Sequence, residues 1–217
     1  MNVLGNEKLE VQKNTEVVGV LLAGGLSLRM KSDKSALEYH GMPQGLHALN
    51  LLKSLCSRVI VSCRENQKEN FSSYNCELVF DKVTGMGPMA GIMEVFKSNP
   101  NCTLMILATD LPFVSLVDLE FLLNERDFQK QATCFVNPEN ALPEPLVSIW
   151  EPHIFKQALD LVSRGITCPR KILMNLDVKL VTPLNLNSIR NINTPDERID
   201  AVQFLSKQKL ELNGVGL

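Results

Sequence analysis

Short apolar runs alternate along the first half of the chain with segments in which apolar residues recur at helical spacing. The runs are apolar on both faces, which is typical of central strands in a sheet covered by helices on both sides. Between the first two runs, leucines at every third position from Leu46 to Leu55 form one helical stripe. The pattern predicts strands at 17–22, 58–63, 76–80 and 102–108, and helices at 43–56, 88–97 and 115–124.

The second half of the chain is less regular but continues the alternation. It predicts strands at 132–136, 146–150 and 178–182, the last at a sheet edge, and helices at 152–163, 169–175 and 195–206. Alternating strands and helices favour a three-layer α/β/α fold with a Rossmann-like, mostly parallel sheet. We expect a flexible N-terminal segment at 1–15, a single domain at 16–206 and a C-terminal tail at 207–217.

Composition and charge narrow the class of partner. The formal net charge of −2 argues against a protein that coats nucleic acid, but it leaves room for a small anion held by local cations. No run approaches the roughly 20 apolar residues of a membrane helix. Six cysteines, none in a CxxC pair, and three histidines argue against a zinc site. Together with an N-terminus unlike a secretory signal, they favour reduced thiols and a cytoplasmic location.

The stretch VLLAGGLSLRMKSDKSAL, at residues 20–37, places glycines and cations directly after the first predicted strand. Gly24 and Gly25 lack a Cβ, so their backbone N–H groups can converge on an anion. Arg29 and Lys34 can then neutralise phosphate oxygens. The spacing fits neither a Walker A loop nor a GxGxxG fingerprint. A glycine turn with surface cations is the alternative interpretation.

Polar residues also follow two other predicted strands. Asp81 begins the stretch DKVTGMGPMAG, in which Gly87 and its neighbours either form a flexible connection or let the backbone approach a ribose or base. Asp110 follows a strongly apolar strand in LATDLP, where a lone buried carboxylate would be costly. A helix N-cap or a Mg²⁺ ligand would explain it, and Ser115 already serves as the better cap for the next helix. We therefore favour Mg²⁺ ligation.

The stretch NINTP near the C-terminus carries two asparagines at alternate positions. A helix entry, with Thr194 as N-cap and Pro195 in the first turn, explains the last two residues. It does not explain Asn191 and Asn193, which point the same way if the chain is extended. These two amides can complete a metal or phosphate shell.

Four of these stretches resemble a known family. LAGGLSLRMKSDK resembles the LAGGxSxRMGxDK signature of sugar-nucleotidyltransferase-like enzymes, with Lys31 where that family usually has glycine. With GPMAG, TDLPF and NINTP, the resemblance over about residues 17–201 extends to the molybdenum cofactor guanylyltransferase family. It implies a nucleotide-diphospho-sugar transferase fold. It also implies transfer of GMP from GTP to the terminal phosphate of molybdopterin, with pyrophosphate released and Mg²⁺ as cofactor.

The resemblance also assigns roles to individual residues. Those implied to contact the nucleotide are Leu22, Ala23, Gly24, Gly25, Lys34, Ser62, Asp81, Gly87 and Asp110. Those implied to be catalytic are Arg29, Lys34 and Asp110, with Asp110 and Asn193 holding the metal. Those implied on the pterin side are Pro145, Arg170 and Asn191, although a solvated helix charge also explains Arg170. Ser62 stands where the family has an asparagine.

The implied reaction needs no general base, because a phosphomonoester with a second pKa near ~6 is already ionised at neutral pH. We expect His40, His47 and His153 to lie away from every motif, and catalysis would consist of positioning and charge neutralisation. Two alternatives stay open: a relative using CTP or a sugar phosphate, and a non-catalytic nucleotide-binding relative, which Lys31 and Ser62 favour. We expect a monomer or weak oligomer that binds GTP and molybdopterin and delivers its product to molybdoenzymes or their chaperones.

Overall fold

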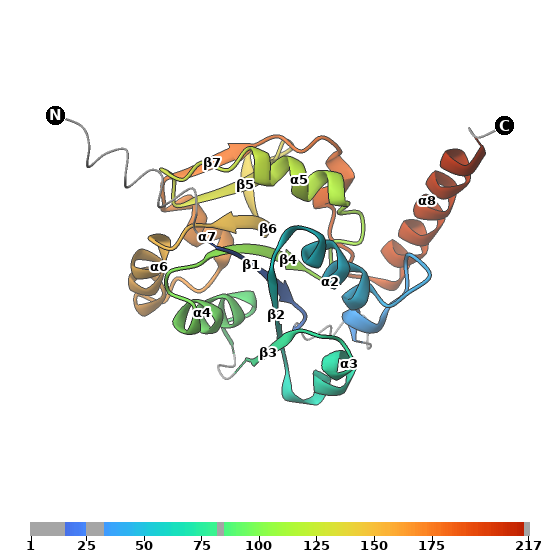
Figure 1. Cartoon of the computed structure of the whole chain (residues 1–217). Coiled ribbons are helices and arrows are strands. Elements are labelled where there is room, and N and C mark those ends of the chain that lie inside the picture. The colour runs from blue at the N-terminus through green and yellow to red at the C-terminus, as the bar shows by residue number, and fades with distance from the viewer. Residues whose placement is uncertain (1–15, 25–32, 82–84, 215–217) are drawn as a thin grey trace.

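A seven-stranded sheet runs through the centre of the protein, which the computed structural model describes at residues 16–24, 33–81 and 85–214, with side chains to 208. The strand order is β3-β2-β1-β4-β6-β5-β7 (Figure 1). In chain order the strands are β1 (Val17–Leu22), β2 (Arg58–Cys63), β3 (Glu77–Phe80), β4 (Thr103–Ala108), β5 (Ala132–Asn137), β6 (Leu142–Trp150) and β7 (Val178–Val181).

Most strand pairs in the sheet are parallel. β1 pairs in parallel with β2 and β4, β2 with β3, and β5 with β7. β6 runs antiparallel to both of its neighbours, β4 and β5. The predicted mostly parallel α/β sheet is therefore confirmed, as is the edge position of the last strand.

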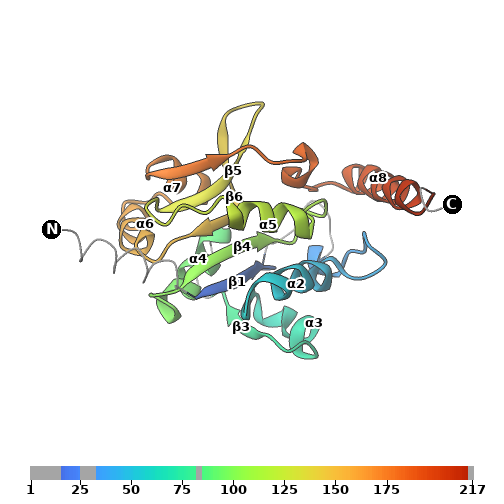
Figure 2. The ribbon, with the colours of Figure 1, turned by 45° about the horizontal axis from the view of Figure 1, so that its top comes forward.

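Helices cover both faces of the sheet, and the alternation of side chains along β1 shows why (Figure 2). Leu21 points into one apolar core, with α2 and α5, while Val20 and Leu22 point into the other, with α4, α6 and α7. These helices are α2 (Gln44–Leu55), α3 (Lys68–Ser72), α4 (Pro88–Ser98), α5 (Leu116–Asn124), α6 (Ile154–Ser163), α7 (Pro169–Met174) and α8 (Pro195–Gly214). Short 3₁₀ turns are η1 (Lys34–Ala36), η2 (Glu65–Gln67) and η3 (Leu186–Ile189).

Two helices begin at the residues that the sequence marks. Ser115 caps α5 by accepting a hydrogen bond from the backbone N–H of Asp118, whose carboxylate in turn accepts from the backbone N–H of Ser115. α4 begins at Pro88, directly after Gly87 with a φ of 54°. Both helix starts therefore lie next to polar residues that follow strands.

Three elements differ from the prediction. β6 begins at Leu142 rather than at residue 146, because a register shift between Cys134 and Phe135 of β5 accommodates Pro145. α8 continues to Gly214 instead of ending at residue 206, since lysine, leucine, glutamate and glutamine in 207–212 are good helix formers. The segment 65–72 forms η2 and α3, which the pattern did not predict. Of the described helices, none has the length and apolarity to cross a membrane.

Candidate active site

The candidate site lies at the carboxyl edge of the sheet, between β1 and β4. From β1 the chain moves to β2 and β3 on one side, and then returns to β4 on the other. In open α/β sheets such a switch point leaves a crevice where ligands bind. The backbone N–H of Thr109 donates to the carbonyl of Leu22 at 3.2 Å, so the two strands stay together to their ends. Residues that follow β1 and β4 therefore lie side by side at this switch point, which is called the crevice below.

Three of the predicted residues meet at this crevice. Lys34 Nζ donates to Asn193 Oδ1 at 2.7 Å and lies 3.6 Å from Asp110 Oδ2. The backbone N–H of Ile192 donates to the carbonyl of Asp110 at 2.9 Å, which brings the NINTP segment against the end of β4. The Lys34 side chain is 15% exposed and that of Asp110 20%, so their charges interact with little screening by water.

The two oxygens of the Asp110 carboxylate differ, and the one without a partner in the described part of the chain is called the spare oxygen. Oδ2 faces Lys34, whereas Oδ1 is buried and has no hydrogen-bond partner among the described residues. Burial raises the pKa of Asp110, and the Lys34 charge opposes that shift in part. A buried oxygen without a partner costs free energy unless a ligand satisfies it.

These residues fit a divalent cation that is shared with a substrate. No group of three or more His, Cys, Asp and Glu side chains within the described ranges could hold a metal alone. Mg²⁺ is commonly bound by one or two carboxylates together with substrate phosphates, and the spare Oδ1 of Asp110 provides such a ligand. The amide oxygen of Asn193, the second predicted ligand, already accepts the hydrogen bond from Lys34.

A second polar group lies at the ends of β2 and β3. Ser62 Oγ donates to Asp81 Oδ1 at 2.6 Å. A Cβ on Gly24 would lie 2.2 Å from Asp81 Oδ2, and one on Gly91 would lie 2.1 Å from Ser62 Oγ. Burial raises the pKa of Asp81, against the hydrogen bond from Ser62 and the charge of Arg64. The carboxylate is therefore fixed between two glycines that larger residues could not replace without moving it.

The remaining predictions near the nucleotide fall into three groups. Leu22 and Ala23 have buried side chains, so they can offer a ligand only their backbone, and Ala23 already donates its N–H to the Ser62 carbonyl at 2.8 Å. A Cβ on Gly87 would meet open space, but its positive φ favours glycine. Gly25, Arg29 and Lys31 lie outside the described residues.

The pterin-side predictions lead to the carboxylate of Glu144, which lies in the same short segment as Pro145 but was assigned no role from the sequence. Arg170 donates to the Pro143 carbonyl at 3.0 Å and to Glu144 Oε2 at 2.9 Å, so it is not merely a solvated helix charge. The Glu144 side chain is 4% exposed. Burial raises its pKa, and the charge of Asp110 raises it further, against the opposing effects of the Leu146 backbone N–H and Arg170.

The strand register explains why Glu144 lies near the site. Leu107 of β4 pairs with Val147 of the antiparallel β6, so the residues that follow β4 run alongside the start of β6. A charged residue between two prolines, before an apolar run, was the available signal for Glu144. Pro145 is buried, and Asn191 Oδ1 is a buried oxygen without a hydrogen-bond partner among the described residues.

One expectation about histidines is wrong. His40 lies against the TDLPF motif, because its Nε2 is 2.8 Å from the carbonyl of Pro112. Its ring stacks on that of His47 with centroids 3.7 Å apart. Burial, and then the neighbouring His40, lower the pKa of His47 to about 4. Through His40 the pair contacts the loop after Asp110 at Pro112, two positions further along the chain.

The chain is similar to known proteins over most of its length. The chain is 33% identical over 183 residues to a molybdenum cofactor biosynthesis bifunctional protein of Synechocystis sp., covering 84% of this chain and 53% of that protein. It therefore spans about half the length of that relative. It is 31% identical over 187 residues to a molybdenum cofactor guanylyltransferase of Pseudomonas fluorescens, covering 82% of this chain and 89% of that one.

A solved structure and a family match complete the comparison. Molybdopterin-guanine dinucleotide biosynthesis protein A of Archaeoglobus fulgidus superimposes with a TM-score of 0.73 at 26% identity, covering 88% of this chain and 99% of that one. Residues 19–179 match the MobA-like NTP transferase domain. That match runs from within β1 past β4 and includes Lys34, Asp81 and Asp110. The chain belongs to the MobA-like NTP transferase family.

Proposed function

We propose that the protein transfers GMP from GTP to the terminal phosphate of molybdopterin, forming molybdopterin guanine dinucleotide and releasing pyrophosphate. The observation that carries the proposal is the meeting of Lys34, Asn193 and Asp110 at the switch point between β1 and β4. The relatives named as guanylyltransferases cover most of the chain and support this choice of nucleotide and acceptor.

The nucleotide lies along the carboxyl edge of the sheet, with its nucleoside toward Asp81 and its phosphates toward Lys34. Because the Asp81 carboxylate is fixed by Ser62 and by contact with Gly24 and Gly91, it presents an acceptor in one orientation. Lys34 neutralises phosphate charge from a partly buried position, where the interaction is stronger than in water. Arg29 remains a predicted second cation.

Asp110 would hold Mg²⁺ through its spare Oδ1 while its Oδ2 stays with Lys34. When bound, Mg²⁺ neutralises charge on the nucleotide phosphates and makes the α-phosphorus a better electrophile. The acceptor phosphate is already ionised at neutral pH, so no side chain has to remove its proton. The chain's own residues contribute by aligning the two phosphates and by screening the charge on the leaving pyrophosphate.

The acceptor side of the crevice lies toward Arg170 and the NINTP segment. Glu144 uses both of its oxygens within the protein and holds Arg170 at the start of β6. The Arg170 side chain, 40% exposed, retains N–H groups for an anionic ligand. Pro145 and Asn191 remain predicted neighbours of the pterin, and delivery to molybdoenzymes or their chaperones remains a prediction.

A direct assay tests the proposal. The purified protein is incubated with molybdopterin, Mg²⁺ and GTP labelled at the α-phosphate, and the products are separated by chromatography. We expect the label to appear in a pterin dinucleotide with one pyrophosphate released for each. CTP in place of GTP is the matched control. Transfer from CTP at the same or a higher rate would contradict the choice of guanine. Binding of GTP without transfer would favour a non-catalytic relative.

A further inference from the structure

We propose that Gln67 is a positioning residue that sets the geometry between the glycine after β1 and Lys34. The inference rests on the proposed function, because the two groups that it aligns are those proposed to hold the triphosphate. Gln67 ends η2 in the segment that the sequence pattern left without structure, and it is only 2% exposed. Its hydrogen-bond partners are protein groups beside the crevice, and it acts through the residues to which it binds.

The side-chain amide of Gln67 is fully used, and its orientation is fixed. Oε1 accepts from the backbone N–H of Arg64 at 3.0 Å and from Arg64 Nε at 3.3 Å. Nε2 donates to the Ala23 carbonyl at 3.0 Å and to Asp33 Oδ2 at 2.8 Å. A flipped amide would place an oxygen against two acceptors and an NH₂ group against two donors. The amide therefore works in one orientation, with both donors directed at residues near the crevice.

One of these donors holds the end of β1. The Ala23 carbonyl binds Gln67, and the Ala23 N–H binds the Ser62 carbonyl at 2.8 Å, so both backbone groups of this residue are tied to neighbouring elements. Gly24 comes directly after it and fits against Asp81 with no space for a side chain. The hydrogen bond from Gln67 therefore fixes the peptide group that joins Ala23 to Gly24.

The other donor holds the start of η1, which carries Lys34. Asp33 caps this 3₁₀ turn: its Oδ1 accepts from the Ser35 N–H at 3.0 Å and from Ser35 Oγ at 2.8 Å. Its Oδ2 accepts from Gln67 and also from the exposed Asn70 at 3.0 Å. Because Lys34 follows the cap, the direction of its side chain toward Asp110 depends on the position of Asp33. Gln67 thus ties the backbone before Gly24 and the cap before Lys34 to one amide.

The substitution Gln67→Glu tests this link with almost no change in shape. At pH 8 a carboxylate would face Asp33 and the Ala23 carbonyl without a donor. We expect the affinity for GTP with Mg²⁺, measured by calorimetry, to fall by roughly tenfold to a hundredfold, because one buried and one partly buried hydrogen bond are lost. Two adjacent carboxylates raise the pKa of one of them. The protonated acid donates again at pH 6, so we expect part of the loss, relative to the wild type at the same pH, to be recovered.

Two further variants keep the test decisive if Gln67→Glu is unstable. Asp33→Asn retains a capping oxygen but turns an amide NH₂ toward Gln67, so it should also weaken GTP binding. The double variant Asp33→Asn, Gln67→Glu restores one donor–acceptor pair, and we expect it to bind GTP more tightly than either single variant. Asn70→Ala is the matched control: it removes the exposed donor to the same Asp33 oxygen and should change the affinity by less than about threefold.

Three results would overturn the inference. The first is Gln67→Glu binding GTP at pH 8 as tightly as Asn70→Ala. The second is a loss of GTP affinity that accompanies a fall in melting temperature and is not recovered at pH 6. A merely structural role predicts that behaviour. The third is a double variant no better than the single ones. Wild-type binding of GTP against CTP is measured in the same series. A preference for CTP would contradict the proposed function while leaving the pattern among these variants interpretable.

Discussion

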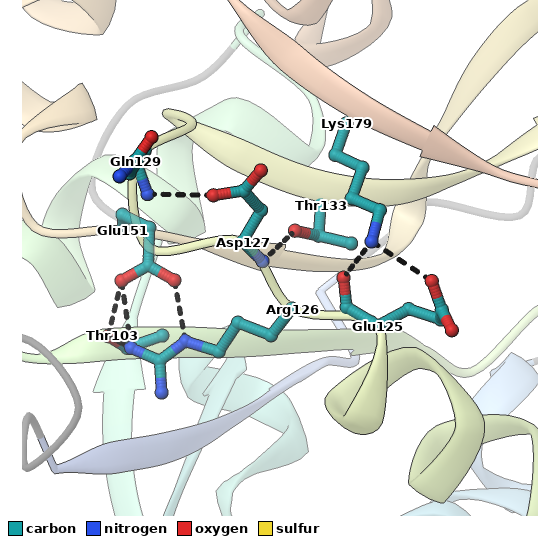
Figure 3. Close-up of polar contacts among 8 residues, drawn as sticks. All are labelled: Thr103, Glu125, Arg126, Asp127, Gln129, Thr133, Glu151 and Lys179. Atoms are coloured by element: carbon teal, nitrogen blue, oxygen red, sulfur yellow. Dashed lines mark hydrogen bonds and ion pairs between the residues drawn. The ribbon is translucent and has the colours of Figure 1, made fainter.

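Two carboxylates lie at opposite ends of β4, and they differ in whether both of their oxygens have hydrogen-bond partners among the described residues. Glu151, beside the start of the strand, has a side chain that is 3% exposed, and it accepts hydrogen bonds from Thr103 and, at both oxygens, from Arg126 (Figure 3). Asp110, after the end of the strand, keeps one buried oxygen without a partner among the described residues. The first carboxylate is satisfied by the protein itself, whereas the described residues leave one oxygen of the second without a partner.

The difference separates a structural charge from a functional one. A buried ion pair with every oxygen satisfied holds elements together, here the end of α5, the start of β4 and the end of β6. A buried carboxylate with an unused oxygen lowers stability and is retained where a ligand completes it. We therefore expect substitutions at the Glu151 end of β4 to alter folding and those at the Asp110 end to alter activity.

The largest expected effect is at the structural end. Arg126→Met leaves Glu151 buried without its main partner, so the free energy of unfolding should fall by about 3–5 kcal/mol. Denaturant unfolding followed by circular dichroism measures the change. The double variant with Glu151→Leu removes both charges and should regain a large part of the loss. A single variant with wild-type stability would show that the pair does not have the structural role assigned here.

In contrast to Arg126→Met, Asp110→Asn should lower activity and leave stability nearly unchanged. We expect kcat/KM to fall by about 10²–10³, because the proposed metal ligand is lost from a site where charge stabilisation dominates. Stability should be unchanged or about 1 kcal/mol higher, since a buried charge with an unused oxygen is removed. Steady-state assays and denaturant unfolding are run on the same preparation. Retained activity, or a large loss of stability, would show that Asp110 has a structural role like that of Glu151.

Lys34→Met tests the role of the cation at the functional end of β4. Lys34 is the ammonium group next to Asp110 and Asn193, and in the proposed complex it neutralises phosphate charge. We expect GTP affinity to fall by about tenfold or more, as for a charged hydrogen bond, and guanosine affinity to change by less than about threefold. Calorimetric titration with both ligands separates the two. Equal losses for GTP and guanosine would argue for a general disturbance of the crevice.

The pH dependence of stability should also differ between wild type and Asp110→Asn. Burial raises the folded-state pKa of Asp110 above its unfolded value. Folding therefore favours the protonated form, and the stabilisation present below the unfolded pKa is lost as pH rises through the folded pKa. We expect the wild type, without nucleotide, to lose stability relative to the variant as pH rises above about 4. A difference that stays constant over pH 4–7 would contradict a raised pKa.

The smallest expected effect is at an exposed pair near the structural end. Lys179 Nζ lies 2.9 Å from Glu125 Oε2, with side chains 35% and 40% exposed (Figure 3). Lys179→Met should change the free energy of unfolding by about 0–1 kcal/mol, because water screens the pair. Denaturant unfolding at low and high salt checks the value. A loss as large as that of Arg126→Met would mean that burial does not decide which ion pairs matter here.

The sequence predicted the strands that end at the crevice better than it predicted the contacts within it. The runs before Ala23 and Asp110 are apolar on both faces, so their ends and the polar residues after them could be recognised from local pattern. Glu144 and Gln67 could not, because their importance depends on the antiparallel register of β6 and on contacts across more than forty residues of chain. The spare oxygen of Asp110 likewise depends on where Lys34 comes to lie.

The central claim is that Asp110 offers this spare oxygen to a divalent ion carried by the nucleotide. Anomalous diffraction from crystals soaked with GTP and Mn²⁺, a scattering substitute for Mg²⁺, tests it most directly. We predict a peak at coordination distance from Asp110 Oδ1, roughly 2.1 Å, with the triphosphate between it and Lys34. Nucleotide bound with the metal away from Asp110, or on a surface that does not include Lys34, would contradict the account.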